Sequence, residues 1–501
     1  MPRVKHQQIL KKLFTPQTFF LTFFIALGGF LRLFNITKNG LWYDEAFSAV
    51  MIRNPLPEII EKGIHDVHPP FYYFLLKLWT LILGESELAL RGFSALFGVL
   101  LIIAVYFLVK NLFNRKVALA SSFLITIAPF FIQYSQEVRM YTLGAFLAVM
   151  STFYLWKALH NNQVRLNLYY WIGYVVFTTL AIYTHYFLIF TVVAQVVGAT
   201  LGILALPKKE RKNLFKKWRQ FSLSLLSVAV LYLPWLPILL KQSNQVREDF
   251  WIPVISLFSV LRTFFVITIG SIETKTLLIN TIPLVLIVAI VIILFRKFKQ
   301  KSTEKSAFIL ILSYLFVPII IGILVSLYHS VFLDRYFIFA GVAVFIILGL
   351  FVNQIKNSKT LIGGMIMISI VAVLLASTNV FGLDAPKKSM RELSAKLEEK
   401  HRSNEKIIHS SSFTFIPLKY YNENKEGIII TDEIHHYSGN ALIEKNDIIE
   451  NLKSYLGKTE HFWIIDTVDF GDPPLPKVSS QFKQKEIYQF GNESLIYYER
   501  K

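Results

Sequence analysis

The sequence contains no cysteine. A disulfide framework and a thiolate metal site are therefore excluded, and any exported portion has to fold without cross-links. The last part of the chain, from residue 384 onward, also shows no glycine-rich phosphate loop. Without such a loop, nothing in this part indicates nucleotide binding.

Charged residues are scarce inside the long apolar runs of the chain. Apolar residues make up 54% of the sequence, and the mean hydropathy is +0.49. Soluble domains contain only about 45–50% apolar residues. Many runs approach the roughly 20 residues that are needed to cross a bilayer. The sequence therefore predicts a polytopic α-helical membrane protein.

The net charge of +19 does not indicate nucleic-acid binding, because of where the positive residues lie. Lysine and arginine cluster in short loops between apolar runs, which is the pattern of cytoplasmic loops. The clearest such loops are residues 207–220 and 296–305, and the N-terminus is basic as well. No small-residue cleavage site follows the first apolar run, so we expect that run to remain as the first helix, with the N-terminus cytoplasmic.

These basic loops predict about eleven transmembrane helices. Two further apolar segments, 68–83 and 255–270, do not fit as crossings, because counting either would place a basic loop outside. We expect both to lie along the outer surface; the alternative is that they cross and that the charge rule fails. The expected transmembrane helices lie at about 18–36, 88–109, 117–133, 139–159, 168–184, 186–206, 221–240, 276–295, 306–328, 335–352 and 360–380.

The composition changes at residue 384, where charge rises and no further spanning run follows. Alternating strand and helix patterns predict a small α/β domain with a mostly parallel sheet. We therefore expect a membrane domain over 1–383 and an extracytoplasmic α/β domain over 384–501. Within the latter, helices are expected at about 387–401, 413–421 and 446–456, strands at 406–409, 427–431 and 462–466, and a strand pair near 487–498.

Polar residues gather at the expected outer ends of the helices. Charges at one membrane face favour chemistry at the surface, whereas a transport pathway would place them in the middle of the bilayer. Each of these residues also has a plainer alternative: Arg91 and Arg139 as helix-end anchors to lipid headgroups, and His185 as an interfacial residue held by hydrogen bonds. The gathered residues include Asp44, Glu45, Asp66, His68, Arg91, Gln136, Glu137, Arg139, His185, Asp334, Arg335 and Tyr336.

Several of these residues lie in segments that carry a family resemblance. Asp44-Glu45 after the first helix, followed by the segment Asp66 to Pro70 (Asp-Val-His-Pro-Pro), resembles the first outer loop of protein O-mannosyltransferases. The segments Ser135 to Tyr141 and Asp334 to Tyr336 resemble motifs of their bacterial relatives. Over about residues 18–352, the chain thus resembles the C-type (GT-C) membrane glycosyltransferases, in particular glycosyltransferase family 39 and related enzymes that use dolichyl- or polyprenyl-phosphate sugars.

The sequence also departs from the O-mannosyltransferases. Those enzymes follow the two prolines with a Gly-Lys pair, whereas Pro70 is followed here by Phe71 to Phe74 (Phe-Tyr-Tyr-Phe). The chain has no large domain inserted in an outer loop, and its extra domain is C-terminal instead. Neither mannose as the sugar nor protein as the acceptor is therefore implied; a glycolipid, a polysaccharide and a protein all remain open.

The resemblance implies a hexosyl- or pentosyltransferase that moves a sugar from a polyprenyl-phosphate donor in the bilayer to an acceptor hydroxyl. We expect an inverting displacement with Asp44 as general base and Glu45 orienting it, although either carboxylate could be the base. Arg335 is the first choice for the donor phosphate, because guanidinium forms paired hydrogen bonds to phosphate. The other expected contacts are Arg139 and His68 for the phosphate, and Glu137, Gln136, His185 and Tyr336 for the substrate.

No cofactor is expected with certainty, and a divalent metal is left open. His68, His185, Asp44 and Glu45 could supply ligands, but their spacing is not diagnostic. An oligosaccharide transferase or polymerase acting on lipid-linked glycans would need a similar cluster of acids and arginines. A secondary transporter or flippase would instead show mid-membrane polar groups and paired halves, and a scaffold would use the C-terminal domain to bind a partner.

Overall fold

The computed structural model describes eight stretches of the chain, and the contacts between residues divide the chain into two units. The helical unit comprises residues 1–34, 94–239 and 250–383, and the mixed unit comprises residues 35–93, 240–249 and 384–501. The described stretches are residues 16–161, 163–248, 252–270, 302–354, 390–422, 427–431, 439–468 and 478–501.

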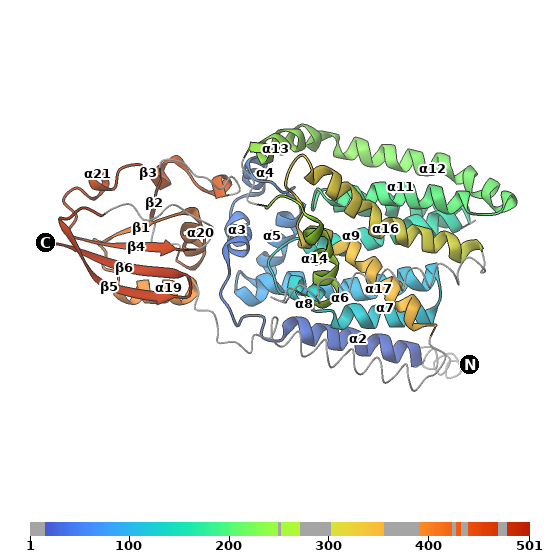
Figure 1. Ribbon diagram of the computed structural model, residues 1–501, viewed down its shortest axis with the longest axis horizontal. Coiled ribbons are helices and arrows are strands. Elements are labelled where there is room, and N and C mark those ends of the chain that lie inside the picture. Colours follow the sequence, from blue (N-terminus) through green and yellow to red (C-terminus); the bar gives the residue numbers. More distant parts are fainter. Residues whose placement is uncertain are drawn as a thin grey trace. The chain divides into compact units, whose positions relative to one another are not determined.

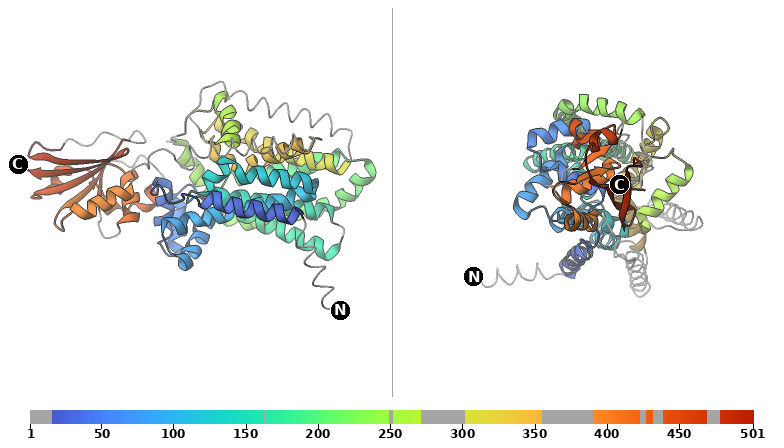
Figure 2. Two further views of the ribbon diagram at one scale, coloured as in Figure 1. Left: turned by 90° about the horizontal axis from the view of Figure 1, so that it is seen from below. Right: turned by 90° about the vertical axis from the view of Figure 1, so that its left-hand side faces the viewer.

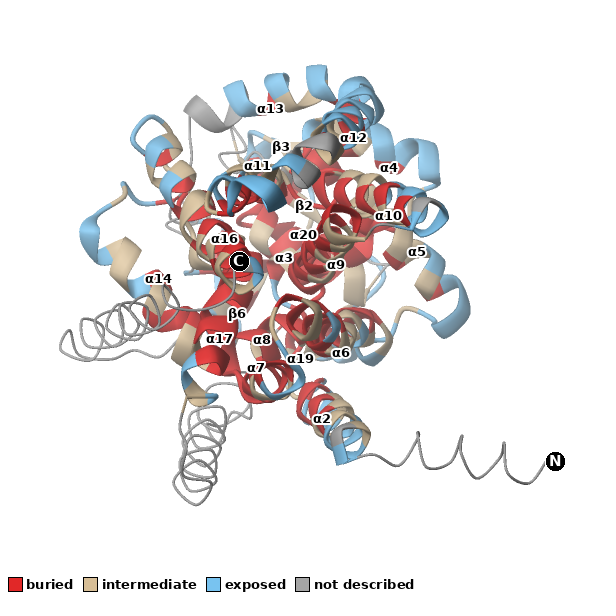
Figure 3. Cartoon of the chain, turned by 90° about the vertical axis from the view of Figure 1, so that its right-hand side faces the viewer, coloured by how far each residue is buried: buried red, intermediate tan, exposed pale blue. Residues whose placement is uncertain are grey.

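Helices make up the described part of the helical unit. Most of them run side by side, with α11 against α16, α9 against α10 and α7 against α17 (Figures 1 and 2). Helices α9 and α17 are buried on most sides, whereas α12 is exposed along much of its length (Figure 3). The helices are α2 (Pro16–Leu33), α6 (Glu87–Leu112), α7 (Arg115–Ile127), α8 (Pro129–Ser135), α9 (Tyr141–His160), α10 (Val164–Ile182), α11 (Leu188–Leu204), α12 (Lys208–Tyr232), α13 (Leu236–Glu248), α14 (Leu257–Ile269), α16 (Ser302–Ser326) and α17 (Ile338–Val352), with short 3-10 turns η1 (Leu233–Trp235) and η2 (Asp334–Phe337). The first turns of α6 and most of α13 belong to the mixed unit.

These helices follow the apolar runs of the sequence closely. Within the described residues, five helices are long and apolar enough to cross a membrane, or six if the bent pair α7 and α8 counts as one span. The expected helices at 276–295 and 360–380 lie outside the described residues, so the number eleven stays a prediction. The expected surface segments form α5 (Phe71–Leu83) and α14, each 13 residues long. At 1.5 Å per residue, each measures about 20 Å, less than the roughly 30 Å of a hydrocarbon core.

The break between α7 and α8 is the main irregularity in the helical unit. The two helices meet at Pro129 with a bend of 59°. Proline has no N–H group, so the carbonyl of Ile125 loses its usual helical partner. The buried Arg32 of α2 donates to this carbonyl (3.3 Å) and to that of Thr126 (3.2 Å), and also to Ser135 Oγ (3.2 Å). Its guanidinium therefore satisfies the polar groups that the bend exposes.

The mixed unit contains the loop that follows the first helix and a six-stranded sheet. Three helices form the loop: α3 (Tyr43–Met51), α4 (Leu56–His65) and α5. Helix α5 ends at Gly84, whose φ of 78° lies in the left-handed region that favours glycine. Helix α3 packs against α20 (Ser412–Tyr421) of the C-terminal part (Figure 1). The ring centroids of Tyr43 and Phe413 lie 4.5 Å apart at this contact.

The sheet has the order β3-β2-β1-β4-β6-β5. Its first four strands pair in parallel, and β6 and β5 continue it in the antiparallel sense. Buried side chains cover both faces, with α19 (Met390–Lys400) contributing to one core and α21 (Leu452–Leu456) to the other. The strands are β1 (Lys406–His409), β2 (Ile428–Ile430), β3 (Ile448–Ile449), β4 (His461–Thr467), β5 (Phe482–Phe490) and β6 (Glu493–Arg500).

One expected element of this part is wrong. The helix expected at 446–456 is divided into a 3-10 turn (Lys445–Asp447), the short strand β3 and the helix α21. The reason is that Ile448 and Ile449 pair with Ile429 and Ile430 at the end of the sheet. Pairing with a strand distant in the sequence overrides the local helical preference.

Replacing Gly98 with alanine tests the packing around Arg32. A Cβ at Gly98 of α6 would overlap Ser135 Oγ and lie 2.8 Å from Arg32 Nε. We expect Gly98→Ala to lower the free energy of unfolding by about 1–3 kcal/mol, as overpacking typically does. The measurement is thermal unfolding of the purified full-length protein in detergent. The matched control is Gly29→Ala in α2, where no neighbouring atom lies within 4 Å of the new Cβ. Equal stability of the two variants would contradict tight packing of Gly98 against Arg32 and Ser135.

Candidate active site

Asp44 and Glu45 occupy the first turn of α3, but their environments differ. The Trp42 N–H donates to Glu45 Oε2 (3.3 Å), which closes the start of the helix. Glu45 is buried, with 1% of its surface exposed, whereas Asp44 is partly exposed. Acidic residues are favoured at this end by the helix dipole. Of the two carboxylates, only that of Asp44 therefore remains accessible to solvent or substrate.

Glu45 is held by Arg91 of α6 in a buried, two-pronged ion pair. Arg91 Nε donates to Glu45 Oε1 (2.8 Å) and Nη2 donates to Oε2 (2.5 Å). The same guanidinium donates to the carbonyls of Ile36 (2.7 Å), Asn39 (2.8 Å) and Gly40 (3.0 Å). Five acceptors match the five N–H groups of an arginine. Arg91 thus fixes both the start of α3 and the segment that leads into it.

His68 lies in a second buried group of the same loop. Its Nδ1 lies 3.5 Å from Asp66 Oδ2, which also accepts a hydrogen bond from the Tyr73 hydroxyl (3.1 Å). Asp66 and His68 are both buried. The structure therefore brings His68 together with Asp66 and with a tyrosine of α5, the helix that follows the two prolines.

The C-terminal part of the chain contacts the loop that carries Asp44 (residues 37–87, the Asp44 loop). No motif in the sequence pointed to these contacts. The Tyr421 hydroxyl donates to Glu87 Oε1 (2.5 Å) and accepts from the Leu41 N–H (2.6 Å). Burial and then the bond to Glu87 raise the pKa of Tyr421, so it stays protonated. Arg391 of α19 donates to Glu87 Oε2 (2.8 Å) and to the carbonyl of Thr37 (3.1 Å).

A further pair of contacts links the end of α3 to α20. Arg53 forms an ion pair with Glu85 (2.9 Å) and donates to the carbonyls of Lys419 (3.1 Å) and Tyr420 (3.3 Å). The Tyr420 hydroxyl donates to the carbonyl of Glu85 (2.8 Å). The contacts with Lys419 and Tyr420 join residues more than 330 positions apart in the sequence, so no local pattern could have identified them.

In the helical unit, the segment 135–141 begins where α8 ends. The Gln136 side chain donates to the carbonyls of Leu31 (3.3 Å), Arg32 (3.2 Å) and Phe34 (3.0 Å), so it caps the end of α2. Arg139 is buried, and its carbonyl accepts from Ser94 Oγ (3.2 Å). Gln136 therefore has a clear structural role that its motif did not reveal.

His185 and Tyr336 lie together in the helical unit. Their ring centroids are 5.1 Å apart, and the ring of Tyr141 lies 6.1 Å from His185. Asp334 accepts from Thr263 Oγ1 (2.5 Å) and Arg262 Nη1 (2.9 Å) of α14. The turn η2 that carries the partly exposed Arg335 is thus held at Asp334 by α14 and at Tyr336 by aromatic contacts.

The expected site residues fall into both units. Asp44, Glu45 and His68 belong to the mixed unit, and Gln136, Glu137, Arg139, His185, Arg335 and Tyr336 belong to the helical unit. Among the described residues, no group of three or more His, Asp or Glu side chains is placed to hold a metal ion.

Comparisons with known proteins identify the architecture. Residues 67–237 match the family model described as dolichyl-phosphate-mannose-protein mannosyltransferase. ArnT from Cupriavidus metallidurans in the apo state is similar over 96% of this chain and 98% of its own, with a TM-score of 0.66 and 12% identity. The chain has the fold of the C-type membrane glycosyltransferases.

Two further solved structures agree with this fold. ArnT bound to undecaprenyl phosphate matches with a TM-score of 0.65 and 12% identity, again over 96% of this chain and 98% of that one. The archaeal oligosaccharyltransferase AglB from Archaeoglobus fulgidus, in complex with an inhibitory peptide and a dolichol-phosphate, has a TM-score of 0.55 and 15% identity over 90% of this chain and 69% of its own. No curated protein sequence matches the chain. The resemblance to C-type glycosyltransferases that the motifs carry is confirmed.

The ion pair between Glu45 and Arg91 leads to a prediction about stability. Glu45→Ala leaves a buried guanidinium without its counter-charge, and we expect it to lower the free energy of unfolding by about 3–5 kcal/mol. The partly exposed Asp44 is the matched control, because Asp44→Ala should change stability by only about 0.5 kcal/mol. Thermal unfolding of the two purified variants measures the difference in stability. Similar losses of stability in both would contradict the prediction that the buried Glu45 contributes more to stability than the partly exposed Asp44.

Removing the hydroxyl of Tyr421 tests the link between α20 and the Asp44 loop. Tyr421→Phe deletes a bond to the Leu41 N–H and one to a carboxylate, so we expect a loss of about 1–3 kcal/mol in unfolding free energy. Tyr455→Phe serves as the control, because the Tyr455 side chain lies over Lys406 and contributes its ring rather than its hydroxyl. The melting temperature and the hydrogen exchange of residues 37–45 measure the effect. If both are the same in the two variants, the hydroxyl of Tyr421 does not stabilise the Asp44 loop.

Proposed function

We propose that the protein is a membrane glycosyltransferase that moves a sugar from a polyprenyl-phosphate donor to an acceptor hydroxyl, with Asp44 as the general base. The observation that carries the proposal is the unequal environment of the two adjacent acids. Arg91 takes both carboxylate oxygens of Glu45, whereas Asp44 stays partly exposed at the start of α3. Glu45 is then the residue that positions the helix bearing the base.

The fold and the composition support a lipid-linked donor. One structure of similar fold is bound to undecaprenyl phosphate and another to a dolichol-phosphate. Several helices of the described chain are apolar enough to lie in a bilayer. A donor with a lipid tail can stay in the membrane while its phosphate and sugar reach polar residues at the surface. The sugar, a hexose or a pentose, is left open.

The reaction that we propose is a one-step displacement at the anomeric carbon. Asp44 accepts the proton of the acceptor hydroxyl while that oxygen forms a bond to the anomeric carbon. The bond from this carbon to the phosphate oxygen breaks, and polyprenyl phosphate leaves with the electron pair, so the configuration inverts. General-base catalysis of this kind contributes about 10²–10⁴-fold to the rate.

The departing phosphate needs positive charge, which we assign first to Arg335. Guanidinium matches two phosphate oxygens at once, and preset donors for developing charge usually make the largest catalytic contribution. The turn η2 presents Arg335 between the anchored Asp334 and Tyr336. Arg139 and His68 are the second choices for the same phosphate.

The remaining motif residues are proposed to contact the substrate. We assign Glu137, His185 and Tyr336 to the sugar, because a carboxylate and an aromatic pair offer a hydrogen-bond acceptor and an apolar face. Gln136 acts by holding the end of α2, and a divalent metal is not required by these roles.

The placement of the reaction follows from the charge pattern. We propose that the N-terminus and the basic loops are cytoplasmic, and that Asp44 and residues 384–501 lie on the extracytoplasmic side of the cell membrane. Residues 1–383 then form the membrane domain. The acceptor, which can be a glycolipid, a polysaccharide or a protein, is met at the outer face.

A second candidate is an oligosaccharide transferase. The likeness to AglB, an oligosaccharyltransferase with a TM-score of 0.55, favours it. This candidate would take a preassembled glycan rather than a single sugar from the lipid, so the size of the transferred group separates the two. A secondary transporter or flippase is the remaining alternative, and neither ArnT nor AglB is described as one.

The test is sugar transfer in membranes that contain the full-length protein and a panel of radiolabelled polyprenyl-phosphate sugars. We expect wild type to transfer label from one donor, and Asp44→Asn to reduce transfer at least about 100-fold because the base is lost. Arg335→Ala in the same assay should lower kcat, because the leaving phosphate loses its positive charge.

Matched controls separate these effects from damage to the fold. Glu58→Gln removes an exposed acid of α4, and Arg115→Ala removes an exposed arginine of α7; neither should affect transfer. Undiminished transfer by Asp44→Asn would rule out Asp44 as the base. Transfer of a preassembled oligosaccharide, with none from any single-sugar donor, would favour the second candidate.

A further inference from the structure

The segment 36–41 leads from α2 into α3 and belongs to no helix or strand. Its carbonyls therefore lack the donors that a helix or a sheet supplies, and they bind water or side-chain donors instead. Arg91 of α6 donates to the carbonyls of Ile36, Asn39 and Gly40. The carbonyls of the two residues between Ile36 and Asn39 need a second donor.

That donor is Arg391, at the start of α19 in the C-terminal part of the chain. Its Nη1 donates to the carbonyl of Thr37 (3.1 Å), and its Nη2 donates to that of Lys38 (3.1 Å). Nη1 also donates to Glu87 Oε2 (2.8 Å), a carboxylate that is only 11% exposed, so this ion pair is screened less than a surface pair. All five carbonyls from Ile36 to Gly40 are therefore bound by two arginines, one from α6 and one from α19.

Helix α19 gives Arg391 a firm support. Met390, Leu393 and Leu397 of this helix are buried in one of the two cores of the sheet. Met390 precedes Arg391 directly, so the backbone that carries the guanidinium is anchored in a packed core. The position of the segment 36–41 is thereby tied to that of the sheet.

Tyr421 of α20 adds a contact at the end of the same segment. Its hydroxyl accepts from the Leu41 N–H (2.6 Å) and donates to Glu87 Oε1 (2.5 Å). Glu87 thus binds Tyr421 with one oxygen and Arg391 with the other. Because Leu41 lies three residues before Asp44, the C-terminal part fixes the chain immediately ahead of the proposed base.

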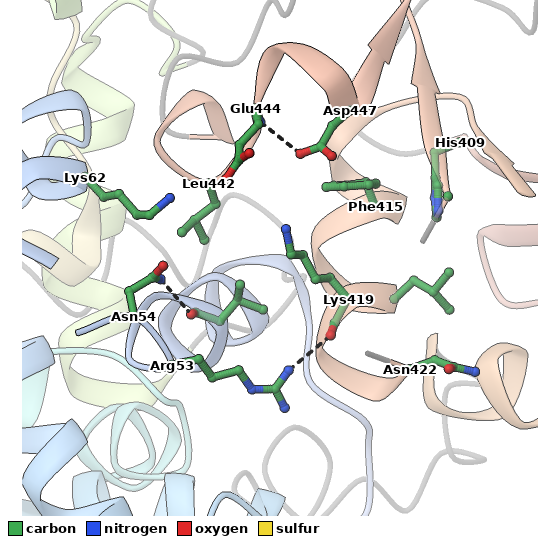
Figure 4. A pocket seen from close by; sticks show the side chains of 13 residues that line it. Arg53, Asn54, Lys62, His409, Phe415, Lys419, Asn422, Leu442, Glu444 and Asp447 are labelled. Atoms are coloured by element: carbon green, nitrogen blue, oxygen red, sulfur yellow. Dashed lines mark hydrogen bonds between the residues drawn. The ribbon is translucent and has the colours of Figure 1, made fainter. Parts of the chain in front are cut away.

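The C-terminal part also holds the other end of α3. Arg53, two residues beyond this helix, donates to the carbonyl of Lys419 (3.1 Å). Figure 4 shows this contact at the edge of a cavity that both parts of the mixed unit line. The helix that carries Asp44 is therefore held at both ends by residues of α19 and α20 or by their backbone.

We propose that Arg391 is a positioning residue for catalysis, through which the C-terminal part of the chain sets the place of Asp44 relative to the substrate. This inference rests on the proposed transferase function and deepens it, because it gives residues 384–501 a role in the same reaction. An irregular segment without donors samples many conformations, and Asp44 would move with it. Misplacing a catalytic group by about 1 Å can cost about 100-fold in rate.

The mobility of the segment can be measured without donor or acceptor. The chain has no cysteine, so Asn39→Cys places a single nitroxide spin label at an exposed position of the segment. Electron paramagnetic resonance of the labelled full-length protein in detergent then reports the local motion. In Arg391→Gln, we expect the rotational correlation time of the label to shorten by about twofold or more, because loops without fixed contacts move on the nanosecond timescale.

Sugar transfer by unlabelled Arg391→Gln tests the consequence for catalysis. We expect kcat to fall about 10- to 100-fold. The KM values for donor and acceptor should stay unchanged, because the proposed substrate contacts do not include Arg391. Rates are normalised to the folded, monodisperse protein and measured well below the melting temperature of each variant, so that a loss of folded enzyme does not imitate the effect.

A second variant and a matched control accompany this one. Tyr421→Phe removes the contact with the Leu41 N–H from a different helix, and it should change label mobility and kcat in the same direction as Arg391→Gln. Arg402→Gln removes an exposed arginine that follows α19, and both readouts should stay at the wild-type value.

Wild-type mobility of the label in Arg391→Gln would overturn the proposal. A mobile label together with wild-type kcat would overturn it as well, because the segment would then be held without any effect on the reaction. Failure of the proposed base has a different signature: undiminished transfer by Asp44→Asn counts against Asp44, whereas the label and the kcat of Arg391→Gln still decide whether the C-terminal part positions the loop.

Discussion

The guanidinium of Arg91 is the contact on which the arrangement of the Asp44 loop depends. It forms an ion pair with Glu45 and at the same time donates hydrogen bonds to three carbonyls between Ile36 and Gly40. A buried ion pair is stable only if its remaining hydrogen-bonding groups are satisfied as well. Here all five N–H groups of Arg91 have acceptors, so the charge can be buried and the helix start is held in one orientation.

A second set of contacts holds the same loop from the C-terminal part of the chain. Glu87 receives Tyr421 on one oxygen and Arg391 on the other, and both of these donors also contact the segment between Thr37 and Leu41. The loop is therefore held on both sides by side chains that are themselves partly buried. Such support limits the movement of Asp44, the residue that we propose as the base, and small displacements of a reacting group lower the rate of an enzyme.

The sequence was sufficient for the local elements and insufficient for the contacts between them. Apolar runs predicted helices such as α6 and α9, and a short apolar strand pattern predicted β1 with its observed bounds. The strand β3 was missed because two isoleucines acquire strand geometry only by pairing with β2. Likewise, Arg32 in the first apolar run could have been noticed as a charge in the wrong place, but its partners at the α7–α8 bend could not.

The candidate site shows the same division between local pattern and environment. The motif segments located the adjacent acids, and chemistry alone could not choose between them, since Asp and Glu have nearly the same intrinsic acidity. The environments of the two differ: Glu45 is buried against Arg91, whereas Asp44 is partly exposed, and adjacent carboxylates can take different roles in different environments. Because both oxygens of Glu45 bind Arg91, Glu45 stabilises the start of α3, and we propose that Asp44 is the residue that accepts the proton. On this proposal, one carboxylate of the pair is structural and the other is the base.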